Sequence, residues 1–185
     1  MEESKEKYIA LLRGINVGGK RKLLMADLKA LFSKLGFSNI ITYIQSGNVV
    51  FESDKDEKNI KLASQIEIAI LDHFKLDVPI MVRKASEWEQ IISDNPFLND
   101  KDIGIERLHL TLLDAIPEQA QIAELKQIVL DSEQFEVIEQ EVFLCCKDKF
   151  SSKSKMTNTL FEKKFKCKST SRNWKTVMKL SELSQ

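Results

Sequence analysis

The stretch NIITYIQSGNVVF, residues 39–51, decides the fold of this chain. Isoleucine, valine, threonine, tyrosine and phenylalanine dominate it on both sides of Ser46-Gly47, and these residue types favour β-strands. A short glycine-containing connection between two such runs is typical of a tight hairpin. We therefore predict two antiparallel strands, residues 39–45 and 48–51, joined through Ser46-Gly47.

The segments on either side of the hairpin complete one structural unit. Residues 8–13 form an apolar run of strand length that ends at Gly14, and residues 78–82 alternate as a strand. Apolar residues recur at three- and four-residue spacing before and after the hairpin, which predicts one helix in each place. The first helix carries Met25, Leu28, Leu31, Phe32 and Leu35, and the second carries Leu62, Ala63, Ile66, Ile70 and Phe74. The resulting order is βαββαβ, the split-βαβ or ferredoxin-like arrangement.

The second half of the chain repeats this order. A strand is predicted at residues 107–113, a helix after Pro117, and a second strand pair at residues 135–138 and 142–146. Helices at about residues 154–165 and 171–183 follow. We therefore predict an α+β protein of two similar split-βαβ halves, packed together and produced by internal duplication. The predicted boundaries are residues 1–84 for the first half, 85–106 for a short helix and linker, and 107–185 for a βαββα(α) second half.

Composition indicates a protein that folds by itself in a reducing compartment. Of its 185 residues, 43% are hydrophobic and 30% are charged, which is far from the pattern of disordered chains. The cysteines are odd in number, and Cys145 and Cys146 are adjacent on a predicted strand, so core packing is favoured over disulfides. No apolar leader precedes the first strand, and no apolar run approaches the roughly 20 residues of a membrane span. We expect a cytoplasmic protein that does not bind membranes.

Charge is balanced overall but unevenly distributed along the chain. Residues 84–141 carry four basic and fourteen acidic side chains, whereas residues 147–179 carry eleven basic and two acidic ones. Such a separation can mark an anion-binding face. It is equally consistent with acidic and basic segments that pair with each other in the fold.

The first candidate site is the segment LLRGINVGGKRK, residues 11–22. Glycines with positive φ let consecutive backbone amides surround an anion, and the segment contains four basic residues and no acidic one. We predict that this segment binds an anionic ligand such as a phosphate through Arg13, Asn16, Gly18, Gly19 and Lys20. Its spacing matches neither the phosphate loop nor the dinucleotide fingerprint, and the glycines could instead serve a tight turn.

The second candidate site combines two segments near the end of the sequence. An arginine beside hydroxyl groups at a helix start offers a bidentate donor and a helix dipole to an anion, and a tryptophan could stack on a base. The residues predicted to bind are Ser154, Lys155, Arg172, Asn173 and Trp174. In the alternative interpretation, Ser171 caps the last helix and Trp174 belongs to its buried face.

Signals for catalysis, metals or cofactors are weak. His109 and Thr111 form a His-x-Thr pattern of the kind found in two-histidine phosphoesterases, but those enzymes need two such patterns and the other histidine, His73, has no matching threonine. There is no HExxH, CxxC or Gly-x-Ser-x-Gly pattern. We predict no metal and no cofactor, and the sequence leaves open whether the protein is an enzyme.

Four stretches resemble a known bacterial family. They are ALLRGINVGGK at residues 10–20, TYIQSGNVVF at 42–51, DVPIMVR at 77–83 and TSRNWKTVMKL at 170–180. Together they resemble the family called domain of unknown function 1697, which implies two similar α+β halves in a cytoplasmic bacterial protein and brings no established activity. Members often have a glycine ahead of the pair equivalent to Ser154-Lys155, whereas this chain has KFSSK at residues 149–153.

Three functional hypotheses follow. The leading one is a binding module or small enzyme for a phosphorylated ligand, such as a nucleotide, held between residues 14–20 and residues 172–174. The second is nucleic-acid binding, although the strands lack the aromatic pattern of RNA-recognition sheets. The third is a structural or protein-interaction role in which the acidic and basic segments pair within one molecule or between two.

Overall fold

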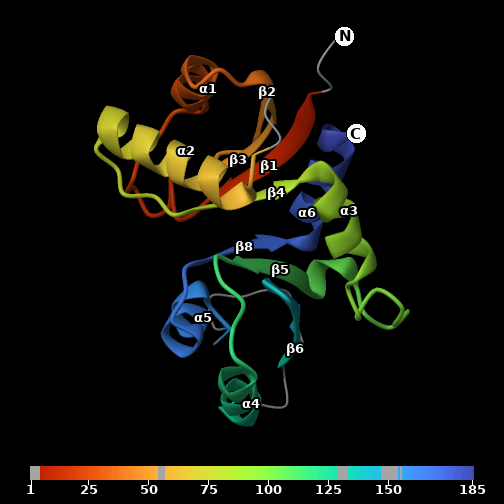
Figure 1. Cartoon of the computed structure of the whole chain (residues 1–185). Helices are drawn as coiled ribbons and strands as arrows, with labels where there is room; N and C mark the ends of the chain where they lie inside the picture. Colours follow the sequence, from red (N-terminus) through yellow and green to blue (C-terminus); the bar gives the residue numbers. More distant parts are fainter. Residues whose placement is uncertain (1–4, 54–56, 129–132, 147–153, 155) are drawn as a thin grey trace. The chain divides into compact units, whose positions relative to one another are not determined.

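The chain is described here by a computed structural model, drawn in Figure 1. It describes residues 5–53, 57–128, 133–146, 154 and 156–185. Contacts between Cα atoms divide the chain into two compact units. The first unit contains Met1–Gln90 and Lys179–Gln185, and the second contains Ile91–Met178.

The first unit is a four-stranded antiparallel sheet with two helices on one face. Its elements are β1 (Glu6–Leu12), α1 (Met25–Lys34), β2 (Ser38–Tyr43), β3 (Asn48–Ser53), α2 (Asn59–Phe74) and β4 (Ile80–Lys84). The strand order is β2-β3-β1-β4, so the first and third strands pair in the centre and β2 lies at an edge. A further helix, α3 (Ala85–Ser93), follows β4 directly. This is the split-βαβ arrangement that the sequence predicts.

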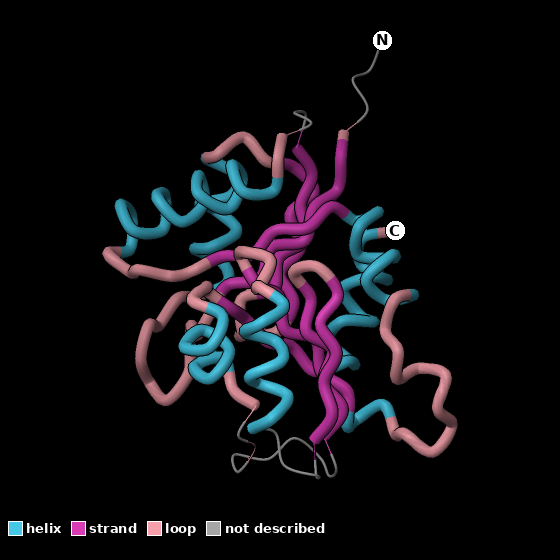
Figure 2. The backbone as a smooth tube through the Cα atoms, turned by 60° about the horizontal axis from the view of Figure 1, so that its bottom comes forward, coloured by secondary structure: helices cyan, strands magenta, loops and turns pink. Residues whose placement is uncertain are grey.

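The second unit repeats the same topology. It contains the short 3-10 helix η1 (Ile105–Arg107), followed by β5 (Leu108–Leu113), α4 (Gln119–Ile128), β6 (Glu133–Ile138), β7 (Glu141–Cys146), α5 (Asn158–Phe165), β8 (Ser169–Asn173) and the start of α6 (Trp174–Ser184). The strand order β6-β7-β5-β8 is that of the first sheet, strand for strand. Figure 2 shows the strands of each sheet running side by side. The prediction of two similar α+β halves is confirmed.

An aromatic cluster forms part of the core of the first unit. Phe32 of α1 and Phe51 of β3 are fully buried with ring centroids 5.3 Å apart, and Phe37 lies 4.5 Å from Phe51. Tyr8 of β1 stacks on Phe51 from the next strand at 5.6 Å. Because each buried large apolar side chain contributes about 1.5–3 kcal/mol, this cluster fixes α1 against the sheet.

The structure corrects two details of the predicted second half. Residues 169–173, predicted partly as helix, form the edge strand β8, and α6 begins at Trp174. Its N-terminal turn is closed by Asn173, whose Oδ1 accepts from the backbone amide of Thr176 at 2.9 Å, and not by Ser171. Ser171 instead lies within β8, opposite Thr111 of β5. The predicted order βαββα(α) therefore becomes a complete βαββαβ followed by a helix.

The predicted hairpin is present with a longer connection. Its strands end at Tyr43 and resume at Asn48, so four residues form the loop where the sequence predicts two. Ile44 and Gly47 adopt left-handed φ values of 49° and 75°. Asn48 Nδ2 donates to the carbonyl of Tyr43 and to Ser46 Oγ, both at 3.0 Å, and these bonds close the loop.

Candidate functional site

The first candidate segment forms a small hairpin of its own, which we call the basic loop (residues 13–22). The amide of Lys20 donates to the carbonyl of Val17 at 3.0 Å, and the amide of Asn16 donates to the carbonyl of Arg21 at 3.1 Å. Gly18 and Gly19 between them have φ values of 57° and 75°. Two successive left-handed residues define a type I′ turn, which explains the glycine pair.

Asn16 anchors the basic loop to the rest of the first unit. Its Nδ2 donates to the carbonyl of Leu23 at 2.8 Å and to the carbonyl of Gln45 at 2.9 Å. Its Oδ1 accepts from the amide of Leu23 at 2.9 Å. Both ends of the amide are therefore engaged within the protein, so Asn16 positions the loop and does not present its side chain to a ligand.

Backbone hydrogen bonds and a close contact at Gly47 hold the base of the basic loop. The amide of Leu12 donates to the carbonyl of Gly47 at 2.8 Å, and a Cβ placed on Gly47 would lie 2.6 Å from Leu12 Cβ. The amide of Arg13 also donates to the carbonyl of Pro79 at 2.9 Å. These bonds bring the stretches at residues 10–20, 42–51 and 77–83 together at one end of the first sheet. There they fix the geometry of the basic loop.

The cations of the basic loop point into solvent. Lys20, Arg21 and Lys22 are exposed, and none of them forms an ion pair with a residue that the structure describes. Arg21 Nη1 makes one long bond of 3.4 Å to the carbonyl of Arg13. A Cβ built on Gly18 or Gly19 would meet no atom within 4 Å, so the backbone at the tip is open to close approach. The loop can therefore offer positive charge and backbone amides together.

The side chains of the second candidate segment are engaged within the second unit. Ser154 Oγ donates to Glu133 at 2.6 Å and accepts from the amide of Met156 at 3.1 Å. Arg172 Nη1 donates to Thr170 Oγ1 at 3.0 Å and to the carbonyl of Ser171 at 2.8 Å. Burial lowers the pKa of the Arg172 guanidinium to about 10, so it keeps its charge at neutral pH. Lys155 lies outside the described residues.

Two more predicted residues have structural roles next to α6. Asn173 caps the helix, as described above, and the side chain of Trp174 is completely buried. A buried indole offers no face on which a base can stack. The basic loop lies in the first unit and residues 172–174 lie in the second, and a ligand shared between them stays a prediction.

A polar network that the sequence did not reveal lies between α5 and the second sheet. Thr111 Oγ1 and Ser171 Oγ are 2.6 Å apart, and Ser171 Oγ donates to Asn158 Oδ1 at 2.8 Å. Ser169 Oγ donates to the same Oδ1 at 3.0 Å. Asn158 therefore ties α5 directly to β8, and Ser171 extends the network to Thr111 of β5. No local pattern predicts this network, because Asn158 lies 11 and 13 positions from Ser169 and Ser171, and Thr111 lies 60 positions from Ser171.

His109 and the three cysteines show no sign of activated chemistry. Burial lowers the pKa of His109, so its imidazole is neutral at pH 7. Burial also raises the thiol pKa of Cys145, and raises those of Cys146 and Cys167 to about 11. Reactive thiols have a lowered pKa, so these shifts argue against a nucleophilic role, and Cys145 and Cys146 are buried in the fold. Within the described part of the chain, no three His, Cys, Asp or Glu side chains gather as a metal site would require.

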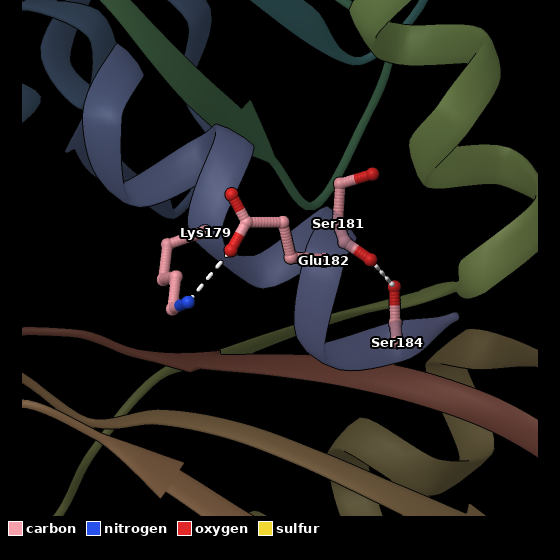
Figure 3. A network of polar contacts seen from close by, with 4 residues as sticks. All are labelled: Lys179, Ser181, Glu182 and Ser184. Atoms are coloured by element: carbon pink, nitrogen blue, oxygen red, sulfur yellow. Dashed lines mark hydrogen bonds and ion pairs between the residues drawn. The ribbon is translucent and has the colours of Figure 1, made fainter.

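Some basic side chains of residues 147–179 form ion pairs within the protein. Lys164 of the basic segment binds Glu124 of the acidic segment at 2.5 Å, and this bond lowers the pKa of the Glu124 carboxyl. Lys179 pairs with Glu182 at 2.6 Å on the last turns of α6, where Ser184 Oγ also donates to the carbonyl of Ser181 (Figure 3). These pairs are exposed to solvent, so each contributes little to stability. They show that the basic segment is not wholly available to an external anion.

Comparison with known proteins identifies a family and a fold. The family model described as "Protein of unknown function (DUF1697)" matches residues 5–143. The solved structure of the conserved bacterial protein SP0830 from Streptococcus pneumoniae is similar over 98% of this chain and 100% of that chain, with a TM-score of 0.77 and 24% sequence identity. No curated protein matches the sequence. Among the described residues, no helix is both long and apolar enough to cross a membrane.

Proposed function

Because the chain belongs to the DUF1697 family, whose function is unknown, we propose a function from its own residues: the basic loop binds the phosphate group of a small phosphorylated molecule. A nucleotide is the leading candidate. The observation that carries the proposal is the presence of three exposed cations, Lys20, Arg21 and Lys22, without ion-pair partners among the described residues.

The geometry of the loop supports a phosphate over other anions. Phosphate oxygens accept several hydrogen bonds at once, and lysine, arginine and backbone amides are their common donors. The loop is held in one shape by Asn16 and by the Gly18-Gly19 turn, so little conformational entropy is lost when a ligand binds. Open space above Gly18 and Gly19 lets an anion reach the backbone.

A second argument favours a small ligand over a nucleic acid. Sheets of this topology that bind RNA stack bases on exposed aromatic side chains of their central strands. In the first unit the aromatic residues of β1 and β3, Tyr8 and Phe51, are fully buried in the helix-covered core. The loop itself is short, so its charge suits one phosphate or pyrophosphate group and not an extended backbone.

Thermal shift measurements test the proposal. ATP, pyrophosphate, a sugar phosphate and a short oligonucleotide would be added to the full chain at low and high salt, since a ligand that binds the native state raises its melting temperature. We expect a shift with ATP and pyrophosphate that weakens at high salt. Replacement of Lys20, Arg21 and Lys22 by glutamine should abolish this shift.

The matched control replaces three other exposed lysines of the first unit, Lys34, Lys58 and Lys61, by glutamine. These residues also lack ion pairs with described residues, so the control changes the net charge equally. The proposal fails if the basic-loop variant keeps the ligand-induced shift, or if the control variant loses it to the same extent. A shift with the oligonucleotide alone would favour the nucleic-acid hypothesis instead.

A further inference from the structure

A second candidate binding site, separate from the basic loop, lies in the first unit beside the edge strand β2. It is a hollow of about 650 Å³, a volume typical of small-molecule sites. The residues that carry the argument are Lys29 and Ser33 of α1, Phe37 before β2, and Asn39 and Ile40 within β2. Leu183 and Gln185 also line it and belong to the same unit.

The residues of β2 that line the hollow include an irregularity in the strand. Ser38 pairs with Glu52 and Ile41 pairs with Val50, so the register shifts between these two positions. Asn39, inside the shift, has a left-handed φ of 47°. Such a bulge bends the strand and leaves residues outside the ladder, and bulges are common at sheet edges and beside functional sites. The regular pairing of β2 with β3 is therefore interrupted beside the hollow.

Two side chains of the first unit's core, Phe37 and Ile40, also line the hollow. Phe37 and Ile40 line it and are 7% and 5% exposed, so each shows only a small part of its surface. Phe37 packs against Phe51 with ring centroids 4.5 Å apart, and Phe51 belongs to the aromatic core cluster. A ligand in the hollow would therefore contact the exposed edges of two apolar side chains that the core already holds in place.

The rim of the hollow carries one lysine, Lys29, without an ion-pair partner among the described residues. Lys29 and Ser33 are four residues apart on α1 and so lie on the same side of the helix. Lys29 forms no ion pair with any described residue. The remaining charged side chains of the rim form hydrogen bonds, because Lys7 donates to the main-chain oxygen of Gln185 and Glu52 accepts from Asn39 Nδ2 at 2.6 Å.

We propose that this hollow binds a small organic monocarboxylate with an apolar body. The carboxylate is held by the Lys29 ammonium and the Ser33 hydroxyl, and the apolar part contacts Phe37 and Ile40. One free cation matches a single negative charge, and the Glu52 carboxylate on the rim would repel a phosphate dianion about twice as strongly as a monocarboxylate. The basic loop and this hollow therefore select different classes of anion.

Titration of the labelled full chain with 4-phenylbutyrate, followed by amide chemical shifts, tests the inference. We expect saturable shifts at Asn39, Ile40 and Ile41, and none with the uncharged analogue 4-phenylbutanol at the same concentration. Lys29→Gln should weaken binding about tenfold or more, as expected for the loss of a hydrogen bond to a charged group. Lys34→Gln, also exposed on α1 but outside the hollow, is the matched control and should bind as the unmodified chain does.

Ser33→Trp provides a second test, because Ser33 is exposed and the new side chain fills the hollow without entering the core. Binding should be lost while the melting temperature stays the same. The inference is overturned if 4-phenylbutyrate leaves the β2 amides unshifted, if Lys29→Gln binds like Lys34→Gln, or if phenyl phosphate binds more tightly than the carboxylate. Lys29→Gln should leave the pyrophosphate-induced thermal shift intact, so the two sites are judged separately.

Discussion

Replacement of Asn16 by alanine is the sharpest probe of how the basic loop is held. The change removes the two bonds that Nδ2 donates to Leu23 and Gln45 and the one that Oδ1 accepts from Leu23. Each such bond contributes about 0.5–1.5 kcal/mol, and the half-buried setting places these near the lower end. Asn16 also has a φ of 56°, where alanine costs about 1 kcal/mol more than asparagine. The expected loss of unfolding free energy is about 3 kcal/mol.

Thermal unfolding of the full chain, followed by circular dichroism, measures this loss. For a chain of this length about 3 kcal/mol corresponds to a decrease in melting temperature of roughly 6–12 °C. Asn16→Gly, which loses the same bonds but tolerates the left-handed backbone, should be about 1 kcal/mol less destabilised than Asn16→Ala. A melting temperature of Asn16→Ala within about 1 °C of the unmodified chain would refute the anchoring role, since surface changes of no consequence give shifts of that size.

Three further predictions concern the packing around the site. Gly47→Ala should destabilise the protein by about 2–4 kcal/mol in denaturant unfolding, because the new Cβ would lie 2.6 Å from Leu12 Cβ. The control Gly36→Ala meets no atom within 4 Å and should destabilise the protein by only about 1–2 kcal/mol. Equal losses in the two variants would contradict the close contact at Gly47. Because burial lowers the folded-state pKa of His109, the stabilisation present above the unfolded pKa near 6.5 should be lost as the pH falls through the lower folded pKa. Denaturant unfolding from pH 7 to 5 should therefore show a shallower decline for His109→Gln, and an unchanged decline would argue against a neutral buried histidine. Iodoacetamide should modify Cys146 and Cys167 on the order of a hundredfold more slowly at pH 8 in native protein than in urea, and equal rates would contradict a pKa of about 11 for the buried thiols.

The parts of the fold with strong periodicity could be predicted from the sequence. The helices of the first half and the strand pairs of both halves follow from apolar spacing, which reports directly on the buried face of each element. The strand β8 could not be found this way, because its sequence, STSRN, is polar and places Ser169 and Ser171 on the network with Asn158. The helix predicted at residues 171–183 therefore begins inside β8, three residues before the true start of α6 at Trp174.

The sequence predicts the charges and the glycine turn of the candidate site, but not the contacts that hold it. The glycine pair and the cations of the basic loop are visible in the sequence, and the structure shows them as a tight turn with exposed side chains. The role of Asn16 was not visible, since one of its partners, Gln45, lies 29 positions away. The burial of Trp174 also depends on tertiary packing, which composition around the residue does not reveal.

The most direct test of phosphate binding by the basic loop is an amide chemical-shift titration of the labelled chain with pyrophosphate. The account predicts that the resonances of Gly18, Gly19 and Lys20 move most and that they saturate together. If these resonances stay in place while pyrophosphate binds elsewhere or not at all, the basic loop is a structural turn and the proposed function is wrong.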